Sequence, residues 1–214
     1  MVSQASTMNS ENMQPDWNTW QEFREAQQEL VLPAGAAAHI PVTIRYIDCG
    51  EAKLGTILLM HGIPTWGYLY QAVIPTLVQA GYRVLAPDFL GHGWSDRRDR
   101  FDRSFQDQAR MIVALLSALA LATVDVVGHD TGGAVALILA IEHSRVVNRL
   151  VITNAVCYDR FDDDMLDFGH PLRWKARPLK ALVKALEESL TAGFSNPGQL
   201  TPQFREGIIA PWAA

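Results

Sequence analysis

Short apolar runs separated by amphipathic stretches dominate the middle of this chain. Four of them are continuously apolar, as strands buried on both faces of a parallel sheet are, and they lie at 56–62, 82–88, 124–130 and 149–155. An earlier run, HIPVTIRYID at 39–48, alternates apolar and polar residues. This alternation predicts a half-buried outer strand.

Helical patterns alternate with these predicted strands. They predict helices near 68–80, 104–121 and 132–143, and a separate helix near 19–30 outside the alternation. Strands and helices that alternate with short connections indicate right-handed crossovers. The pattern therefore predicts an α/β fold with a doubly wound, mostly parallel sheet.

The character of the sequence changes at both ends of the alternating region. A polar run rich in Ser, Asn and Gln opens the chain and predicts a loose arm. After residue 155 come an acidic loop, a proline-marked segment and a helical pattern near 179–192, which indicate a helical insertion over the sheet. We therefore divide the chain into an arm and N-terminal helix at 1–38, a core at 39–156 and the start of a helical cap at 157–214.

Composition narrows the possible partners. The 214 residues include 18 Lys and Arg against 23 Asp and Glu, and the net charge of −5 gives no attraction to nucleic acid or anionic lipid. No apolar stretch approaches the ~18 residues of a membrane span, and the N-terminus lacks a signal-peptide pattern. Two cysteines favour a reducing compartment over a disulfide framework. We expect a cytoplasmic protein without a nucleic-acid or membrane partner. Because no Cys/His cluster or carboxylate set has ligand spacing, we also expect no metal.

The pentapeptide Gly128-His129-Asp130-Thr131-Gly132 stands where a predicted strand meets a predicted helix. It has the form glycine, any residue, nucleophile, any residue, glycine, with Asp130 as the nucleophile. Flanking glycines leave room for the strained backbone of so sharp a turn, and the amides of the following helix favour negative charge. The alternative is that Asp130 only caps that helix.

Two further motifs follow predicted strands. HGIPTWGYLY begins at His61, and PDFLGHGWSD begins at Pro87. Both stand at the carboxyl ends of strands, where open α/β sheets place their sites. A turn after His61 would aim the Ile63 amide at the same point as Asp130.

In this order and spacing, the three motifs resemble the α/β-hydrolase superfamily, in the branch of haloalkane dehalogenases and epoxide hydrolases that use an aspartate nucleophile. The resemblance runs from about residue 40 to 156 and implies the N-terminal part of that fold. It implies that Asp130 is the nucleophile and that the backbone N–H groups of Ile63 and Thr131 form an oxyanion hole. The implied activity is hydrolysis, without a cofactor or a metal, of a small, largely apolar molecule that bears a halide or an epoxide.

The chemistry of an aspartate nucleophile has its own physical logic. A carboxylate of ordinary pKa is already ionised at neutral pH, so it can attack a saturated carbon without a base. The product is an alkyl ester of the enzyme. A histidine-activated water must then hydrolyse this ester through an intermediate whose oxyanion the two amides hold.

The sequence departs from the family pattern in its acid and its base. In this branch both follow the cap, and neither stands in the expected place here, so the chain looks truncated within the cap. His170, at the start of the insertion, is the candidate replacement for the base. Asn154 stands where one dehalogenase subgroup carries its acid, and an amide cannot serve in that role. We therefore expect one turnover at most, or inactivity.

The substrate-binding positions also depart from the family. Ile63 and Thr131 occupy the positions where dehalogenases often carry halide-binding Asn and Trp. Trp174 could supply one indole donor, Tyr158 could protonate an opened epoxide, and Trp66 suggests an aromatic wall at the site mouth. Ordinary packing is the alternative for each of these three.

Two other interpretations stay open. An ester substrate fits the same motif, because the turn specifies the nucleophile and not the electrophile. Alternatively, the chain is non-catalytic, either as a truncated product or as a fold reused for binding. Without later strands, the strand at 149–155 would form an exposed edge with unpaired amides, which invites self-association.

Overall fold

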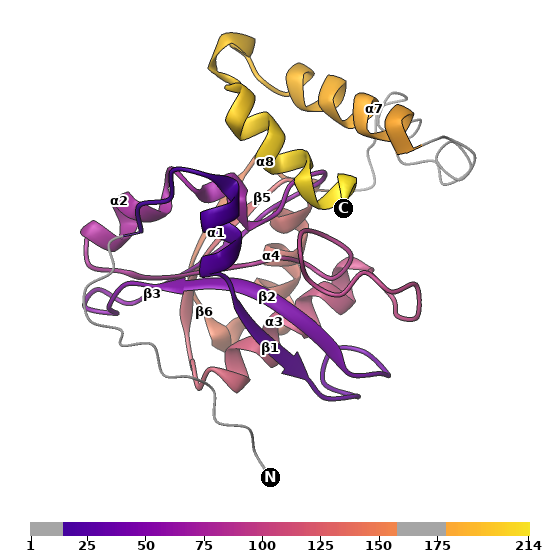
Figure 1. Ribbon diagram of the computed structural model, residues 1–214. Helices are drawn as coiled ribbons and strands as arrows, with labels where there is room; N and C mark the ends of the chain where they lie inside the picture. Colours follow the sequence, from indigo (N-terminus) through magenta and orange to yellow (C-terminus); the bar gives the residue numbers. More distant parts are fainter. Residues whose placement is uncertain (1–14, 158–178) are drawn as a thin grey trace.

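The computed structural model of this protein describes residues 15–157 and 179–214. At its centre lies a six-stranded sheet in the order β1-β2-β4-β3-β5-β6 (Figure 1). The strands are β1 (Gln28–Leu32), β2 (Val42–Cys49), β3 (Thr56–Met60), β4 (Arg83–Pro87), β5 (Val124–His129) and β6 (Val147–Thr153). β4, β3, β5 and β6 run parallel, whereas β1 and β2 pair antiparallel with their neighbours. The predicted mostly parallel α/β sheet is confirmed.

Helices cover both faces of the sheet, which is why β3, TILLM, is buried at all five positions. The helical elements are α1 (Trp20–Ala26), η1 (Gly67–Tyr70), α2 (Ile74–Gln79), α3 (Phe105–Ala118), α4 (Thr131–Glu142), η2 (Ser144–Val146), α7 (Leu179–Ala192), η3 (Pro197–Gln199) and α8 (Pro202–Ala213). One core cluster joins α3 and α4 to the sheet, and a second joins α1, η1, α2 and α8 to its other face. The motif at 128–132 spans the junction of β5 and α4, with Asp130 between the two elements.

The N-terminal region differs from the sequence prediction. A helix was expected over 19–30, but α1 ends at Ala26 and β1 follows directly. A capping box between Thr19 and Glu22 starts α1, and an extended backbone at Gln27 ends it. β1 takes the sheet edge, so the prediction that the 39–48 run forms an outer strand is wrong, because β2 lies between β1 and β4.

β6 forms the opposite edge of the sheet. The prediction that this run is buried on both faces is wrong, since six of its seven residues are exposed. In the described part of the chain β6 pairs with β5 alone, which leaves Leu150, Val151 and Ile152 in contact with solvent. Within the described residues, β6 therefore forms the exposed sheet edge that the sequence predicts.

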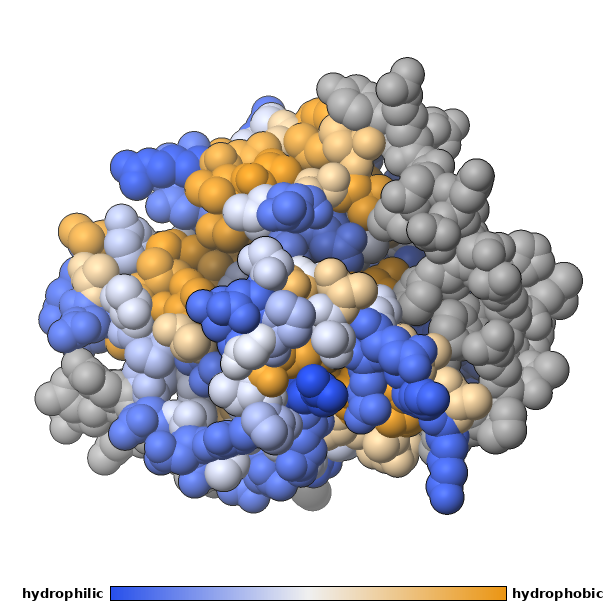
Figure 2. Space-filling view, turned by 90° about the horizontal axis from the view of Figure 1, so that it is seen from above, coloured by the Kyte–Doolittle hydropathy of each residue, from blue (hydrophilic) through white to orange (hydrophobic). Residues whose placement is uncertain are grey.

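α8 covers the end of the molecule where the sequence motifs gather. α7 spans the predicted 179–192, and α8 follows it and crosses above α1 and η1 (Figure 1). Viewed from that side, the surface carries hydrophobic patches (orange) between hydrophilic residues (blue) (Figure 2). Among the helices of the described ranges, none combines the length and apolar character that crossing a membrane requires.

Candidate active site

Asp130 sits on a sharp turn between β5 and α4. Its backbone has φ 53° and ψ −123°, a conformation that costs free energy in any residue with a side chain. Asp130 occupies the N-cap position of α4, but its side chain makes no capping hydrogen bond. The alternative that Asp130 serves only as a helix cap is therefore wrong.

Glycines make room for this turn. A methyl group on Gly128 would lie 2.6 Å from the Gly132 carbonyl oxygen, and one on Gly132 would lie 2.3 Å from the Met60 carbonyl oxygen. Real side chains do not approach backbone so closely. The two flanking glycines of the motif are thus required by the packing of α4 against β5 and β3.

The Asp130 carboxylate meets the loop that follows β3. The backbone N–H of Ile63 donates a hydrogen bond to Asp130 Oδ2 at 2.8 Å. A side chain on Gly62 would collide with the same carboxylate, because its Cβ would lie 2.3 Å from Asp130 Oδ2. The structure therefore brings two of the sequence-predicted residues, Ile63 and Asp130, into direct contact.

The surroundings of Asp130 act on its pKa in opposite directions. Burial of the half-exposed carboxyl raises the pKa above its ordinary value, whereas the hydrogen bond from Ile63 and the nearby His129 lower it. The Thr131 amide also lowers the pKa of Asp130. In the described part of the chain, Ile63 donates the hydrogen bond to this carboxylate. The net effect is a raised pKa.

His61 supports the loop rather than acting as a base. Its Nε2 accepts a hydrogen bond from the Phe89 amide at 3.0 Å, so the proton stands on Nδ1, which lies 3.0 Å from the Gly62 carbonyl oxygen. Burial lowers the pKa of His61 to about 3. His92, close to His61, likewise has a pKa lowered to about 4 by burial.

The other described histidines lie at the ends of elements or in a loop. Nδ1 of His129 lies 3.1 Å from the Thr153 carbonyl oxygen, at the end of β6. His143 ends α4, and His39 is exposed ahead of β2. Of the five histidines that the structure describes, none forms a hydrogen bond with the Asp130 carboxylate. His170 lies outside the described residues, as do Tyr158 and Trp174.

Trp66 does not form a wall at the site mouth. Its side chain is fully buried, and its indole Nε1 donates to the Gly207 carbonyl oxygen of α8 at 2.8 Å. The ordinary packing alternative holds for Trp66. Asn154, the residue in place of an acid, is exposed just after β6.

A buried carboxylate that the sequence analysis missed joins two of the motif loops. Asp88, fully buried, accepts hydrogen bonds from the Gly67 amide at 2.8 Å, the Trp94 amide at 2.9 Å and the Gln27 side chain at 3.0 Å. Burial raises its pKa to about 6, although these three donors favour the ionised form. The signal in the sequence was an acidic residue that directly follows a continuously apolar strand.

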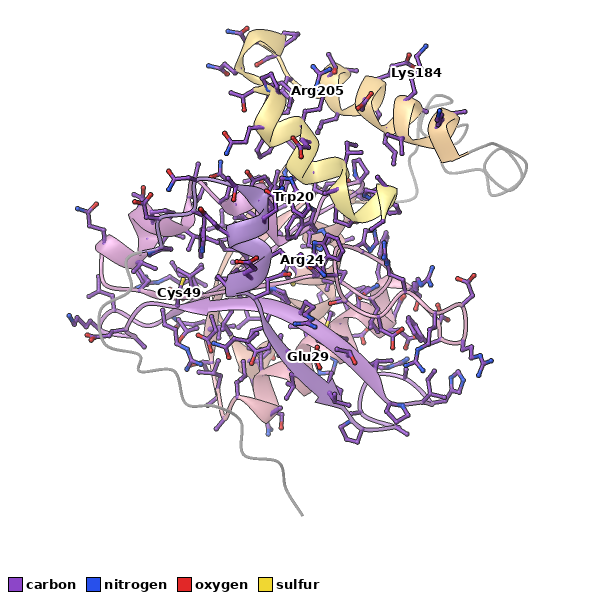
Figure 3. All side chains as sticks on the ribbon, viewed as in Figure 1. Trp20, Arg24, Glu29, Cys49, Lys184 and Arg205 are labelled. Carbon is purple, nitrogen blue, oxygen red and sulfur yellow. The ribbon has the colours of Figure 1, made fainter. Side chains whose placement is uncertain are left out.

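A cavity of about 590 Å³ lies apart from this turn, between α1, α7 and α8. Trp20, at the top of α1 beneath α8, and Arg205 are among its walls (Figure 3). Asp130, Ile63 and Thr131 do not line it. Within residues 15–157 and 179–214, no group of three or more His, Cys, Asp or Glu side chains could hold a metal ion.

Comparison with known sequences finds curated relatives that match about half of this chain. A haloalkane dehalogenase from Mycobacterium marinum is 40% identical over 121 residues, which cover 56% of this chain and 41% of the relative. A haloalkane dehalogenase from Psychrobacter cryohalolentis is 35% identical over 114 residues, covering 53% and 38%. A cis-3-alkyl-4-alkyloxetan-2-one decarboxylase from Xanthomonas campestris is 31% identical over 125 residues, covering 55% and 41%. The chain thus matches about two-fifths of the length of these relatives.

Solved structures and a family model agree on the fold. A probable hydrolytic enzyme from Pseudomonas aeruginosa superposes with a TM-score of 0.71 at 28% identity, covering 87% of this chain and 59% of its own. An α/β-hydrolase fold protein from Burkholderia ambifaria gives a TM-score of 0.72 at 22% identity, covering 87% and 68%. The family model of the alpha/beta hydrolase fold matches residues 55–205. The chain therefore belongs to the α/β-hydrolase fold family, and about half of it is similar in sequence to haloalkane dehalogenases.

Proposed function

We propose that the protein is a hydrolase in which Asp130 attacks a saturated carbon of a small, largely apolar molecule bearing a halide or an epoxide. The observation that carries this proposal is the carboxylate on the sharp turn, free of the helix cap and held by the Ile63 amide. A purely structural aspartate at this position would use its side chain on α4. The dehalogenase relatives favour the same substrate class.

The hydrogen bond from Ile63 gives the two carboxylate oxygens of Asp130 different roles. Oδ2 accepts the amide hydrogen bond at 2.8 Å, so Oδ1 is the attacking oxygen. Oδ1 forms a bond to carbon while the carbon–halogen bond breaks, and the halide leaves with the bonding electrons. With an epoxide, the ring C–O bond breaks instead, and the ring oxygen takes up a proton from solvent water. Oδ2 becomes the carbonyl oxygen of the ester.

The second step needs the same amide for a different purpose. Attack of water on the ester places negative charge on Oδ2, where the N–H groups of Ile63 and Thr131 would stabilise it. A base must take the proton from that water. Because no described histidine reaches the Asp130 carboxylate, we expect the 214-residue chain to form the ester and to release the product slowly.

Intact-mass measurement tests the first step. Folded 214-residue protein incubated with 1,2-dibromoethane should gain one alkyl group, on the peptide that contains Asp130. Because attack needs the ionised form, adduct formation should increase with pH, with a midpoint above the ordinary aspartate value of 3.8. Asp130→Asn should form no adduct, since a neutral amide is a poor nucleophile.

Asp125→Asn is the matched control. Asp125 stands on the same strand, where its carboxylate accepts a hydrogen bond from Asn148, and its loss should leave the adduct in place. An unmodified mass from folded protein would favour the non-catalytic interpretation. Rapid multiple turnover would instead show that a base acts in this chain and would contradict the slow second step.

A further inference from the structure

Residues 61–67, called the 61–67 loop, include the Ile63 amide. α8 accepts a hydrogen bond from a side chain of this loop. Pro211 has no N–H, so the carbonyl of Gly207, four residues earlier, has no helical partner. The indole Nε1 of Trp66 donates to this carbonyl oxygen at 2.8 Å. Pro211 thus leaves the Gly207 carbonyl oxygen available to accept the hydrogen bond from Trp66.

Gly207 is fitted to the same contact. A methyl group at this position would lie 2.3 Å from Tyr68 and 2.8 Å from Cβ of Trp20. The absence of a side chain therefore lets α8 lie directly on η1, close enough for the indole of Trp66 to reach the helix backbone.

A second indole makes the reciprocal contact. Trp212, which follows Pro211, donates from Nε1 to the Pro64 carbonyl oxygen at 2.7 Å, and its ring packs edge-on against His92. Pro64 is the direct neighbour of Ile63. α8 therefore contacts the 61–67 loop at two points, Pro64 and Trp66.

We propose that α8 positions the Ile63 amide against Asp130, with Trp212 and Trp66 as positioning residues. This inference rests on the proposed function, in which that amide holds Oδ2. From the sheet side, the loop is fixed by bonds of its own, such as Thr65 Oγ1 to the Gly62 carbonyl oxygen at 2.8 Å. The two indoles fix its outer side, so the cap helix controls a backbone donor that lies almost 150 residues earlier in the sequence.

Amide hydrogen exchange measured by NMR on the 214-residue chain tests this coupling without any substrate. Trp212→Phe keeps most of the apolar ring but loses the hydrogen bond to Pro64. The Ile63 amide should then exchange about tenfold faster, because one hydrogen bond that restrains the loop is lost. The amide of Leu58, fully buried in β3, reports on global unfolding and should keep its wild-type rate.

Trp20→Phe is the matched control. Trp20 also anchors α8 through its indole, which donates to Glu206 at 3.1 Å, but it comes from α1 and not from the loop. The variant should leave exchange at Ile63 unchanged. Equal acceleration at Ile63 in both variants, or acceleration at Leu58 as large as at Ile63, would overturn the proposal, as would a wild-type rate at Ile63 in Trp212→Phe.

Pro211→Ala gives a second route should Trp212→Phe fail to fold. The new N–H would compete with Trp66 for the Gly207 carbonyl, so Ile63 should again exchange faster. Where adduct forms, both variants should also move the pH midpoint of alkylation upward, because the Ile63 amide lowers the pKa of Asp130 alongside His129 and the Thr131 amide. A chain that never alkylates would refute the proposed function while the exchange rates still decide the role of α8.

Discussion

Asp130 and Gly62 illustrate how closely single residues fit at this turn. Asp130 has a backbone conformation that favours glycine, yet a carboxylate stands there, and its neighbours accommodate it by having no side chains. Gly62 lies directly against the Asp130 side chain. A Cβ on Gly62 would lie 2.3 Å from both Cβ and Oδ2 of Asp130. Its role is therefore to leave space for the carboxylate and not to adopt an unusual backbone angle.

Gly62→Ala should slow alkylation of Asp130 by about tenfold or more, since the added methyl group would push the carboxylate away from the Ile63 amide. The crowding should also lower the free energy of unfolding by about 1–3 kcal/mol. Intact mass against time gives the first effect, and urea denaturation gives the second. Gly193→Ala is the control, because its nearest contacts beyond the chain neighbours are at 3.5 Å or more. Wild-type alkylation in Gly62→Ala would contradict this explanation.

The residues of the site differ in how far the sequence reveals them. Asp130 and Ile63 belong to short motifs beside strands, so their contact follows from where the parallel strands end. Asp88 stands in an equally visible motif, but its role depends on Gln27, Gly67 and Trp94, which come from three separate segments. No pattern within a single segment predicts that meeting.

At the scale of elements, the central strands were predictable and the two edges were not. β3 and β4 are continuously apolar because both of their faces are covered, and that pattern is visible in the sequence. β1 is only five residues long and begins two residues after α1 ends. Residues 28–30 of β1 therefore fall within the predicted helix at 19–30. β6 contains a continuous apolar run, Leu150–Ile152, as β3 does, yet in the described part of the chain only one strand pairs with it.

The exposed edge of β6 leads to a prediction about association. We expect copies of the 214-residue chain to self-associate through β6, which presents unpaired amides beside exposed apolar side chains. Val151→Lys, at a position that is 51% exposed, should shift the protein toward monomer, because two lysines would face each other across the paired edges. Sedimentation velocity over a range of concentrations measures the effect.

Ile141→Lys provides the control for that experiment. Ile141 is 78% exposed on α4, so the variant removes a larger apolar surface away from the edge and should leave association unchanged. A wild-type chain that stays monomeric throughout, or equal effects of the two lysines, would show that the edge of β6 does not drive association.

The molecule as a whole has two cores, one on each face of the sheet, and the second of them includes residues of α8. Ile208 of α8 is buried in the same cluster as Phe23 of α1 and Trp66. The motif residues beside Trp66 in the sequence suggest a place for it at the site mouth. Its burial depends on a helix that begins at residue 202, a contact that local patterns do not encode.

Asp88 makes the free energy of unfolding depend on pH. Burial raises its pKa to about 6, above the value of an aspartate in an unfolded chain, so the folded state binds this proton more tightly. As pH increases from about 4 to 6, the unfolded chain loses the proton first, and the free energy of unfolding decreases. The loss that this group contributes should reach about 2–3 kcal/mol near neutral pH.

Urea denaturation of wild type and Asp88→Asn between pH 4 and 7.5 isolates this contribution. Asparagine does not titrate, so the stability of the wild type relative to the variant should decrease steadily across that range, whatever the offset from the rearranged hydrogen bonds. Asp99→Asn removes an exposed carboxylate and should give a curve nearly parallel to wild type. Parallel curves for Asp88→Asn as well would mean that the three donors from Gly67, Trp94 and Gln27 fully offset burial. Asp88 would then keep its charge in the core at no pH-dependent cost.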